Sequence, residues 1–117
     1  MKKKEMSKMD FYLKSVKNNY SATLSYEDGQ YILRAGSTVS KSVSTHFKSH
    51  ATVELRRKEH GISLNNSILK QDIVFKSSTV AGEFVCGSSC NGPSCWKNSD
   101  GLTIKEWMGN NDGTKNK

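Results

Sequence analysis

Long hydrophobic runs are absent from this 117-residue sequence, which contains one proline and three cysteines. No stretch approaches the roughly 18 apolar residues that a membrane-spanning helix needs, and the N-terminus lacks the apolar segment of a secretory signal. We therefore expect no membrane partner. The odd set of Cys86, Cys90 and Cys95, without an export signal, indicates reduced thiols and a cytoplasmic location.

Apolar residues in general are few. They make up 34% of the chain, against roughly 45–50% in globular proteins, a count that includes glycine. The polar excess gathers at the two ends, which cannot bury a hydrophobic face. We therefore expect a flexible basic arm at residues 1–10, a single domain at 11–108 and a disordered polar tail at 109–117.

Positive charge is unevenly distributed along the chain. The formal net charge is +7, with six lysines against two acidic residues in positions 1–20 and five basic against two acidic residues in positions 41–60. Positions 61–100 hold three residues of each sign. Localised positive charge suits contact with a polyanion such as nucleic acid, although a solvated helix face with a flexible arm gives the same pattern.

A β-hairpin is predicted over residues 22–35. Asp28 and Gly29 suit its two-residue turn, because both positions require a positive φ. Pairing outward from the turn sets Tyr26 opposite Tyr31, and the face that they share is apolar along both strands. We expect the other face to be mostly exposed to water; it carries Thr23, Ser25, Glu27, Gln30, Ile32 and Arg34.

A central helix is predicted from an apolar stripe that recurs at every fourth residue, formed by Val43, Phe47, Ala51 and Leu55. Gly61 is placed to end this helix. At about 100° per residue, several side chains project away from the stripe, namely His46, Val53, Arg56, Arg57 and His60. We therefore expect Arg56 and Arg57 on the solvent face of the helix.

Shorter elements are predicted in the rest of the chain. The apolar runs at 68–69 and 73–75 favour strands, and the serines at 77–78 favour the start of a short helix that Gly87 ends. Residues 103–106 form a capping box that opens a final helix. The order of elements predicts an α+β domain with an N-terminal hairpin, a central helix, short strands and small C-terminal helices.

Motifs for catalysis or metal binding are not found in the sequence. Thiolates of Cys86, Cys90 and Cys95 could surround zinc, but no fourth ligand completes a recognised spacing, since His60 lies 26 positions upstream of the first cysteine. The alternative is that they pack as small apolar side chains. The three histidines lie in one predicted helical segment, and no Walker loop, dinucleotide-binding loop or paired-carboxylate motif is present. We expect no enzymatic activity, no metal and no cofactor.

Residues suited to hold nucleic acid occur mainly in the C-terminal half. Helix amides behind Ser77 and Ser78 could receive a phosphate, while Asn91 offers an amide and Trp96 a stacking plane. Each also has an ordinary structural explanation, because serine caps helices, Asn-Gly forms turns and tryptophan packs in cores. The predicted nucleic-acid-binding set comprises Arg56, Arg57, Lys76, Ser77, Ser78, Asn91, Trp96 and Lys97.

The order of these residues resembles a known family. Gly36-Ser37 follows the hairpin, an arginine pair precedes Gly61, and the segments 75–81 and 87–92 come before Trp96-Lys97. Over about residues 11–108 this order is similar to the domain of unknown function 4357, and it also resembles the restriction-enzyme adenine-methylase associated domain. The resemblance implies that the domain occurs beside a GIY-YIG nuclease module or in a restriction-modification-like protein. No Gly-Ile-Tyr or Tyr-Ile-Gly occurs in this chain, so the resemblance does not imply cleavage activity.

The favoured hypothesis is a non-catalytic module that binds nucleic acid, DNA in particular and including modified DNA, beside a nuclease or methylase in DNA processing or defence. The basic residues Lys2, Lys3, Lys4, Arg56 and Arg57 would neutralise phosphates. The alternative is a protein-interaction or homo-oligomerisation module in which the edge of the hairpin pairs with a partner strand or with a second copy.

Overall fold

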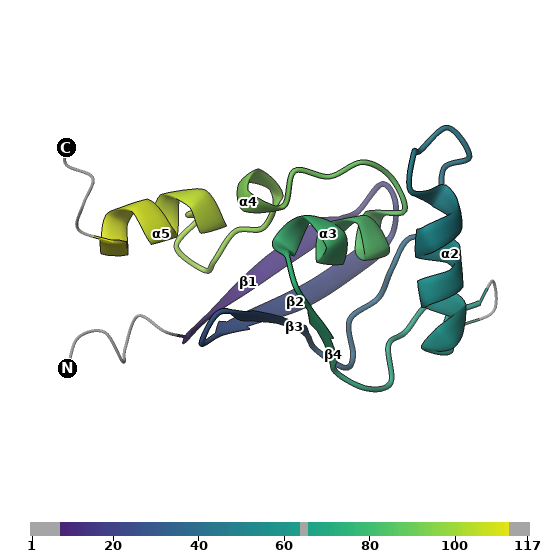
Figure 1. Ribbon diagram of the computed structural model, residues 1–117, viewed down its shortest axis with the longest axis horizontal. Coiled ribbons are helices and arrows are strands. Elements are labelled where there is room, and N and C mark those ends of the chain that lie inside the picture. Colours follow the sequence, from purple (N-terminus) through teal and green to yellow (C-terminus); the bar gives the residue numbers. More distant parts are fainter. Residues whose placement is uncertain (1–7, 64–65, 113–117) are drawn as a thin grey trace.

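Alternating apolar and polar residues give this protein an antiparallel sheet with one buried face. The computed structural model describes residues 8–63 and 66–112. Its elements are β1 (Lys8–Ser15), β2 (Tyr20–Glu27), β3 (Gln30–Leu33), α2 (His50–Glu59), β4 (Ile73–Phe75), α3 (Ser78–Cys86), α4 (Gly92–Cys95) and α5 (Ile104–Asp112). The strand order is β1-β2-β3-β4. The helices α3, α4 and α5 lie along one side of the sheet and α2 stands at one end (Figure 1), so the α+β prediction is confirmed.

The predicted hairpin is confirmed as β2 and β3. Tyr26 pairs with Tyr31, and Asp28 and Gly29 adopt positive φ values of 49° and 85° in the turn. Both strands lie inside the sheet, because β1 pairs with β2 and β4 pairs with β3. The expectation that the hairpin offers a free edge to a partner strand is therefore wrong, since its backbone groups are used within the sheet.

The helix-covered face of the sheet supplies much of the core. Phe11, Leu24 and Leu33 are fully buried on this face, and Phe84 of α3 and Trp107 of α5 belong to the same apolar cluster. The rings of Phe11 and Trp107 meet edge to face with their centroids 5.6 Å apart. The first strand therefore contributes to the core together with the hairpin.

Local sequence signals set the limits of α3 and α5. Ser77 caps α3 by accepting a hydrogen bond from the Val80 amide at 3.1 Å, and Gly87 ends the helix with a left-handed φ of 73°. At α5, the Thr103 hydroxyl accepts from the Glu106 amide at 3.1 Å, and the Glu106 carboxylate accepts from the Thr103 amide at 3.0 Å. Both predicted caps are confirmed.

The central helix faces the other way from the prediction. Val43 and Phe47 lie in the turns before α2 and pack against Val53 from there. The inward side chains of the helix are Val53 and Arg57, which stand one helical turn apart, whereas Leu55 is 58% exposed. The four-residue spacing that predicted the stripe therefore spans a turn region and a helix, and it is not a helical periodicity.

Regular secondary structure continues past residues 11–108 at both ends. β1 begins at Lys8, within residues 1–10, and α5 runs to Asp112, within residues 109–117. The phosphate contacts predicted for Lys2, Lys3 and Lys4 lie outside the described residues. β1 begins and α5 ends at the same end of the molecule, opposite α2 (Figure 1). Within the described part of the chain, no helix is long and apolar enough to cross a membrane.

Close contact between α4 and the start of α3 depends on a glycine. The Gly92 amide donates a hydrogen bond to the Thr79 hydroxyl at 3.0 Å. A Cβ at Gly92 would overlap backbone atoms of Ser78 and Thr79. Because backbone cannot yield as the end of a flexible side chain can, any side chain at this position forces α4 away from α3.

Replacing Gly92 with alanine is expected to lower the free energy of unfolding by about 1–3 kcal/mol, the usual cost of overpacking. Gly109→Ala is the matched control, because a Cβ at Gly109 in α5 meets nothing within 4 Å and alanine favours a helix by about 0.5–1 kcal/mol. Urea unfolding of both variants measures the difference. Equal stability of the two variants would contradict the close contact.

Candidate nucleic-acid interface

The side chain of Arg57 is buried at the contact between α2 and α3. It is 5% exposed, and its Nε donates a hydrogen bond to the Phe84 carbonyl at 2.9 Å. Its Nη1 donates to the Ser40 carbonyl at 2.9 Å, while its Nη2 donates to Ser40 Oγ at 3.0 Å and to the Val85 carbonyl at 3.2 Å. The carbonyls of Phe84 and Val85 belong to the last turn of α3, where carbonyl groups lack helical partners and carry partial negative charge. Arg57 thus caps α3 from another helix.

Arg57 is therefore a structural residue, and its predicted place on the solvent face is wrong. Burial lowers the pKa of Arg57 to about 10, which still leaves the guanidinium charged at neutral pH. Arg56 is only half-buried, and its guanidinium carbon lies 5.7 Å from the centre of the Phe75 ring. Of the predicted arginine pair, Arg56 alone has a side chain that reaches the surface.

The start of α3 is covered by other parts of the protein. Ser77 is the cap of the helix, and Ser78 is 3% exposed beneath Gly92 of α4. The Ser78 carbonyl accepts a hydrogen bond from Trp96 Nε1 at 3.1 Å. The protein itself therefore fills the phosphate position that was predicted at Ser77 and Ser78, whereas Lys76 beside it is exposed.

Trp96 offers no stacking surface, which corrects the role predicted for it. Its side chain is fully buried in the core. Asn91 is exposed before α4 and makes no capping hydrogen bond with its side chain. Lys97 is also exposed, and its backbone exchanges two hydrogen bonds with Tyr12 of β1, at 2.7 and 3.1 Å. Asn91 and Lys97 are thus accessible, and the tryptophan between them is not.

Tyr12 is an exposed aromatic residue that the sequence analysis missed. It is 41% exposed and points to the open face of the sheet, because its neighbour Phe11 points into the core. Antiparallel partners project to the same side of a sheet, so Tyr12 and Lys97 are neighbours. A hollow of about 400 Å³ adjoins them and is lined by Tyr12, Leu13, Lys14, Cys95, Lys97, Asn98, Ser99 and Gly101.

A second hollow, of about 500 Å³, lies between the β1–β2 turn, the segment 40–44 and the end of α3. We call it the serine–lysine hollow. None of its lining residues is acidic; they are Lys17, Asn18, Asn19, Ser40, Lys41, Ser42, Ser44, Cys86, Gly87 and Ser88. Ammonium, hydroxyl and amide groups together suit a phosphate or another anion. Sequence motifs could not reveal this hollow, because three distant segments form it.

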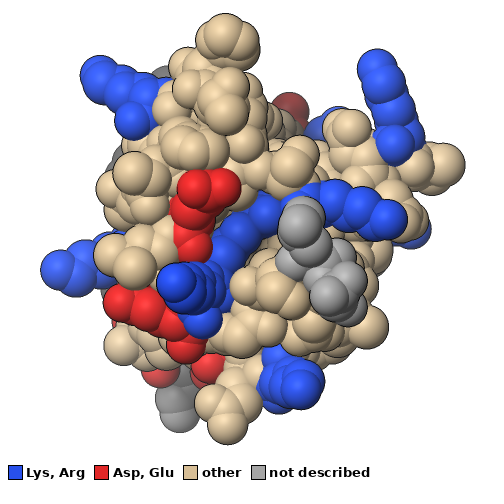
Figure 2. Space-filling model, turned by 90° about the vertical axis from the view of Figure 1, so that its right-hand side faces the viewer, with Lys and Arg blue, Asp and Glu red and all other residues tan. Residues whose placement is uncertain are grey.

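Unlike the serine–lysine hollow, the rest of this end of the molecule carries acidic residues. A neighbouring hollow of about 560 Å³ shares Lys41 and Ser42 with it and is bounded by α2. There Glu54 lies 3.2 Å from His50, one turn earlier on the helix. Figure 2 shows Lys and Arg side chains spread over this end of the molecule with acidic side chains beside them. The charges on the α2 surface are therefore mixed, and they do not favour the binding of a polyanion there.

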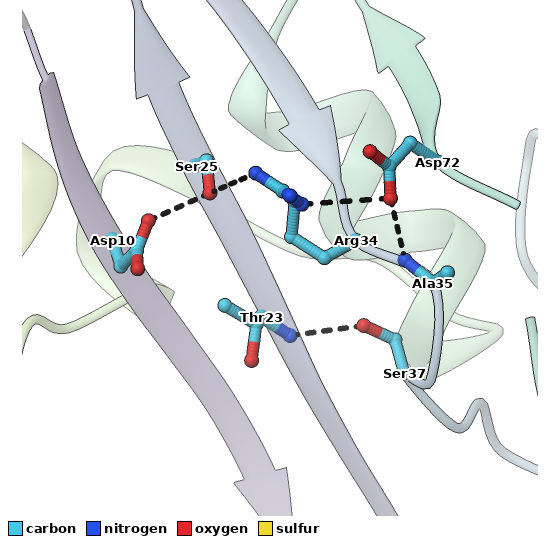
Figure 3. A network of polar contacts seen from close by, with 7 residues as sticks. All are labelled: Asp10, Thr23, Ser25, Arg34, Ala35, Ser37 and Asp72. Atoms are coloured by element: carbon cyan, nitrogen blue, oxygen red, sulfur yellow. Dashed lines mark hydrogen bonds and ion pairs between the residues drawn. The ribbon is translucent and has the colours of Figure 1, made fainter.

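A polar network crosses the open face of the sheet (Figure 3). Ser25 Oγ donates a hydrogen bond to Asp10 at 2.6 Å, and Arg34 donates to Ser25 at 3.4 Å. Arg34 also lies 3.4 Å from the Asp72 carboxylate, which accepts from the Ala35 amide at 2.8 Å. Two carboxylates against one guanidinium make the centre of this face unfavourable for a polyanion. The basic positions near Tyr12 and in the serine–lysine hollow lie outside the network.

The fold and its hollows define a small α+β domain with a hydroxyl-rich basic surface at one end. A family model described as Domain of unknown function (DUF4357) matches residues 11–108. The chain belongs to this family. Neither the curated proteins nor the solved structures contain a match.

Removing the Arg57 side chain is expected to destabilise the fold strongly. Arg57→Ala should lower the free energy of unfolding by at least about 3 kcal/mol, because three buried carbonyls lose their charged donor and each such loss costs about 1–3 kcal/mol. Arg57→Lys should restore only part of this, because one ammonium cannot replace a forked donor. The matched control Arg56→Ala should cost less than about 1 kcal/mol. Denaturant unfolding followed by circular dichroism tests this, and equal losses in the two alanine variants would refute the structural role.

Proposed function

We propose that this protein is a non-catalytic module that binds nucleic acid, DNA in particular, with phosphate groups in the serine–lysine hollow. The observation that carries the proposal is the lining of the hollow, where Lys17 and Lys41 stand among serine and asparagine side chains and no described lining residue carries a carboxylate. Lysine ammonium groups neutralise phosphate, and hydroxyl and amide groups donate hydrogen bonds to its oxygens. Such contacts position a nucleic acid without reading its sequence.

An unpaired base would stack on Tyr12 in this proposal. The ring is exposed, and Lys14 and Lys97 line the hollow beside it. An aromatic plane flanked by positive charges is the usual platform for single-stranded nucleic acid. Lys17 follows β1 and lines the serine–lysine hollow, so one strand of nucleic acid can follow β1 from the stacked base to the bound phosphate.

The setting that we propose comes from the family resemblance, which supports a role beside a nuclease or methylase in DNA processing or defence. The proposed cytoplasmic location agrees with the free thiols of Cys86, Cys90 and Cys95, since a reducing compartment keeps cysteines unpaired.

Replacing Lys17 and Lys41 together with alanine is expected to weaken binding to DNA and to make it less dependent on salt. Each lost phosphate contact should reduce the slope of log affinity against log salt by about 0.9 for a duplex. The control pair Lys70→Ala and Lys105→Ala removes the same charge at exposed positions that do not line the hollow. Fluorescence polarisation from low to physiological salt measures both slopes.

Two outcomes would contradict the proposal. Equal losses in the two lysine pairs would mean that only net charge matters and that the hollow is not the site. Failure of the unmodified protein to bind duplex, single-stranded or adenine-methylated DNA at low salt would exclude nucleic-acid binding altogether.

Tyr12→Ala is expected to reduce affinity for single-stranded DNA by about 5- to 150-fold, because stacking of one base on an aromatic side chain contributes about 1–3 kcal/mol. Tyr12→Phe keeps the ring and should retain the affinity. Duplex binding should change little in either variant, since paired bases are not free to stack on the ring. A competition assay between the two forms of DNA measures this, and wild-type affinity in the alanine variant would rule out stacking at Tyr12.

A further inference from the structure

Three free thiols lie in a row between the end of α3 and the end of α4. Cys86 is the last residue of α3, Cys95 is the last residue of α4, and Cys90 lies in the connection between the two helices. The Cys90 sulfur packs against Gly82, which lies one turn before Cys86 on the same face of α3. Among the described residues, no group of three or more cysteine, histidine or acidic side chains is placed to hold a metal ion. The fold therefore brings the Cys90 thiol back to the face of α3 that carries Cys86.

Cys86 is the member of the row that other groups stabilise as a thiolate. The neighbouring Cys90 thiol, the hydroxyl of Tyr20, which lies 3.5 Å away on β2, and the buried charge of Arg57 all favour the thiolate of Cys86. They outweigh burial and the carboxylate of Glu83, and they lower the pKa of Cys86 to about 6. Interaction with Cys86, together with burial, raises the pKa of Cys90, so Cys90 keeps its proton.

Small reagents can reach Cys86 through the serine–lysine hollow. Cys86 lines this hollow together with Lys17 and Lys41, whose ammonium groups make the hollow basic. Cys90 does not line it, and its sulfur packs against Gly82. Cys86 is thus the thiol that reagents reach from the hollow, and Cys90 is the protonated thiol nearest to it in the chain.

We propose that Cys86 is a site of oxidation by hydroperoxides and that Cys90 is its resolving partner. The Cys86 thiolate attacks the peroxide, so an S–O bond forms, the O–O bond breaks and the leaving oxygen departs as water or an alcohol after protonation. The Cys90 sulfur then attacks the oxidised sulfur of Cys86. An S–S bond forms, the S–O bond breaks and the oxygen leaves as water with the Cys90 proton. One peroxide is reduced by two electrons for each disulfide that forms.

Formation of this disulfide requires a local movement. Both cysteines are free, and an S–S bond is only about 2.05 Å long, so the sulfur of Cys90 must leave Gly82 and approach Cys86. The connection between them contains Gly87 and Ser88, which line the serine–lysine hollow. Oxidation is therefore expected to reshape the wall of that hollow.

Alkylation of the reduced full-length protein tests the nucleophile first. The rate at which iodoacetamide modifies Cys86, measured by peptide mass mapping, should rise with a midpoint near pH 6. At that pH Cys86 should react about tenfold faster than a free cysteine peptide, after allowance for the weaker nucleophilicity of a less basic thiolate. A midpoint near the ordinary thiol pKa of about 8.5 would overturn the proposal. This measurement needs no variant.

Hydrogen peroxide treatment tests the pair. The native protein should lose two hydrogen atoms in mass and yield a peptide that links Cys86 to Cys90. Cys90→Ser should stop at a sulfenic acid on Cys86 that dimedone traps, Cys86→Ser should abolish the fast reaction, and the matched control Cys95→Ser should leave it unchanged. A link between Cys90 and Cys95 alone, or oxidation of Cys86 no faster than in urea-unfolded protein, would overturn the proposal. These readouts do not depend on DNA binding.

Discussion

The buried guanidinium of Arg57 needs hydrogen-bond acceptors that replace the water it has lost, and this need determines how the segments around it are arranged. Ser40 and the last carbonyls of α3 meet this need, so α2, the segment after β3 and α3 are fixed relative to one another. The same segment then continues along the end of α3, where the Ser44 amide donates to the Gly87 carbonyl at 2.7 Å. The serine–lysine hollow is bounded by the segments that this arginine holds in place, although Arg57 itself does not line it.

Much of the fold could be predicted because its signals are local. The Asp28-Gly29 turn defined the register of β2 and β3, and the capping residues located the start of α3 and of α5. β1 was missed although its residues alternate and a short turn at 16–19 joins it to β2. The positive φ of that turn falls on Asn19, and no Asn-Gly or Asp-Gly pair marks it. Strong turn and cap signals were therefore reliable, whereas spacing patterns without such a signal, at β1 and at 43–55, were not.

The candidate site was predicted less well, because burial of a polar or aromatic side chain is decided by the whole structure. Arg57 and Trp96 have ordinary surface and stacking functions in many proteins, and nothing in their neighbourhood in the sequence shows that α3 supplies acceptors to both. Lys97 is exposed, as its predicted role requires, but its aromatic neighbour is Tyr12, 85 positions earlier in the numbering. The composition predicted a positively charged surface. Its position beside an exposed aromatic ring follows from the pairing of Tyr12 in β1 with Lys97.

The position of the first strand and the last helix affects how this domain can be combined with others. Because β1 begins and α5 ends on the side away from α2 (Figure 1), a linker attached at either point leaves from the far side of the molecule. A tethered enzyme would therefore not need to pass in front of the surface formed by the β1–β2 turn and the segment 40–44. A linker at either point would therefore leave the serine–lysine hollow uncovered.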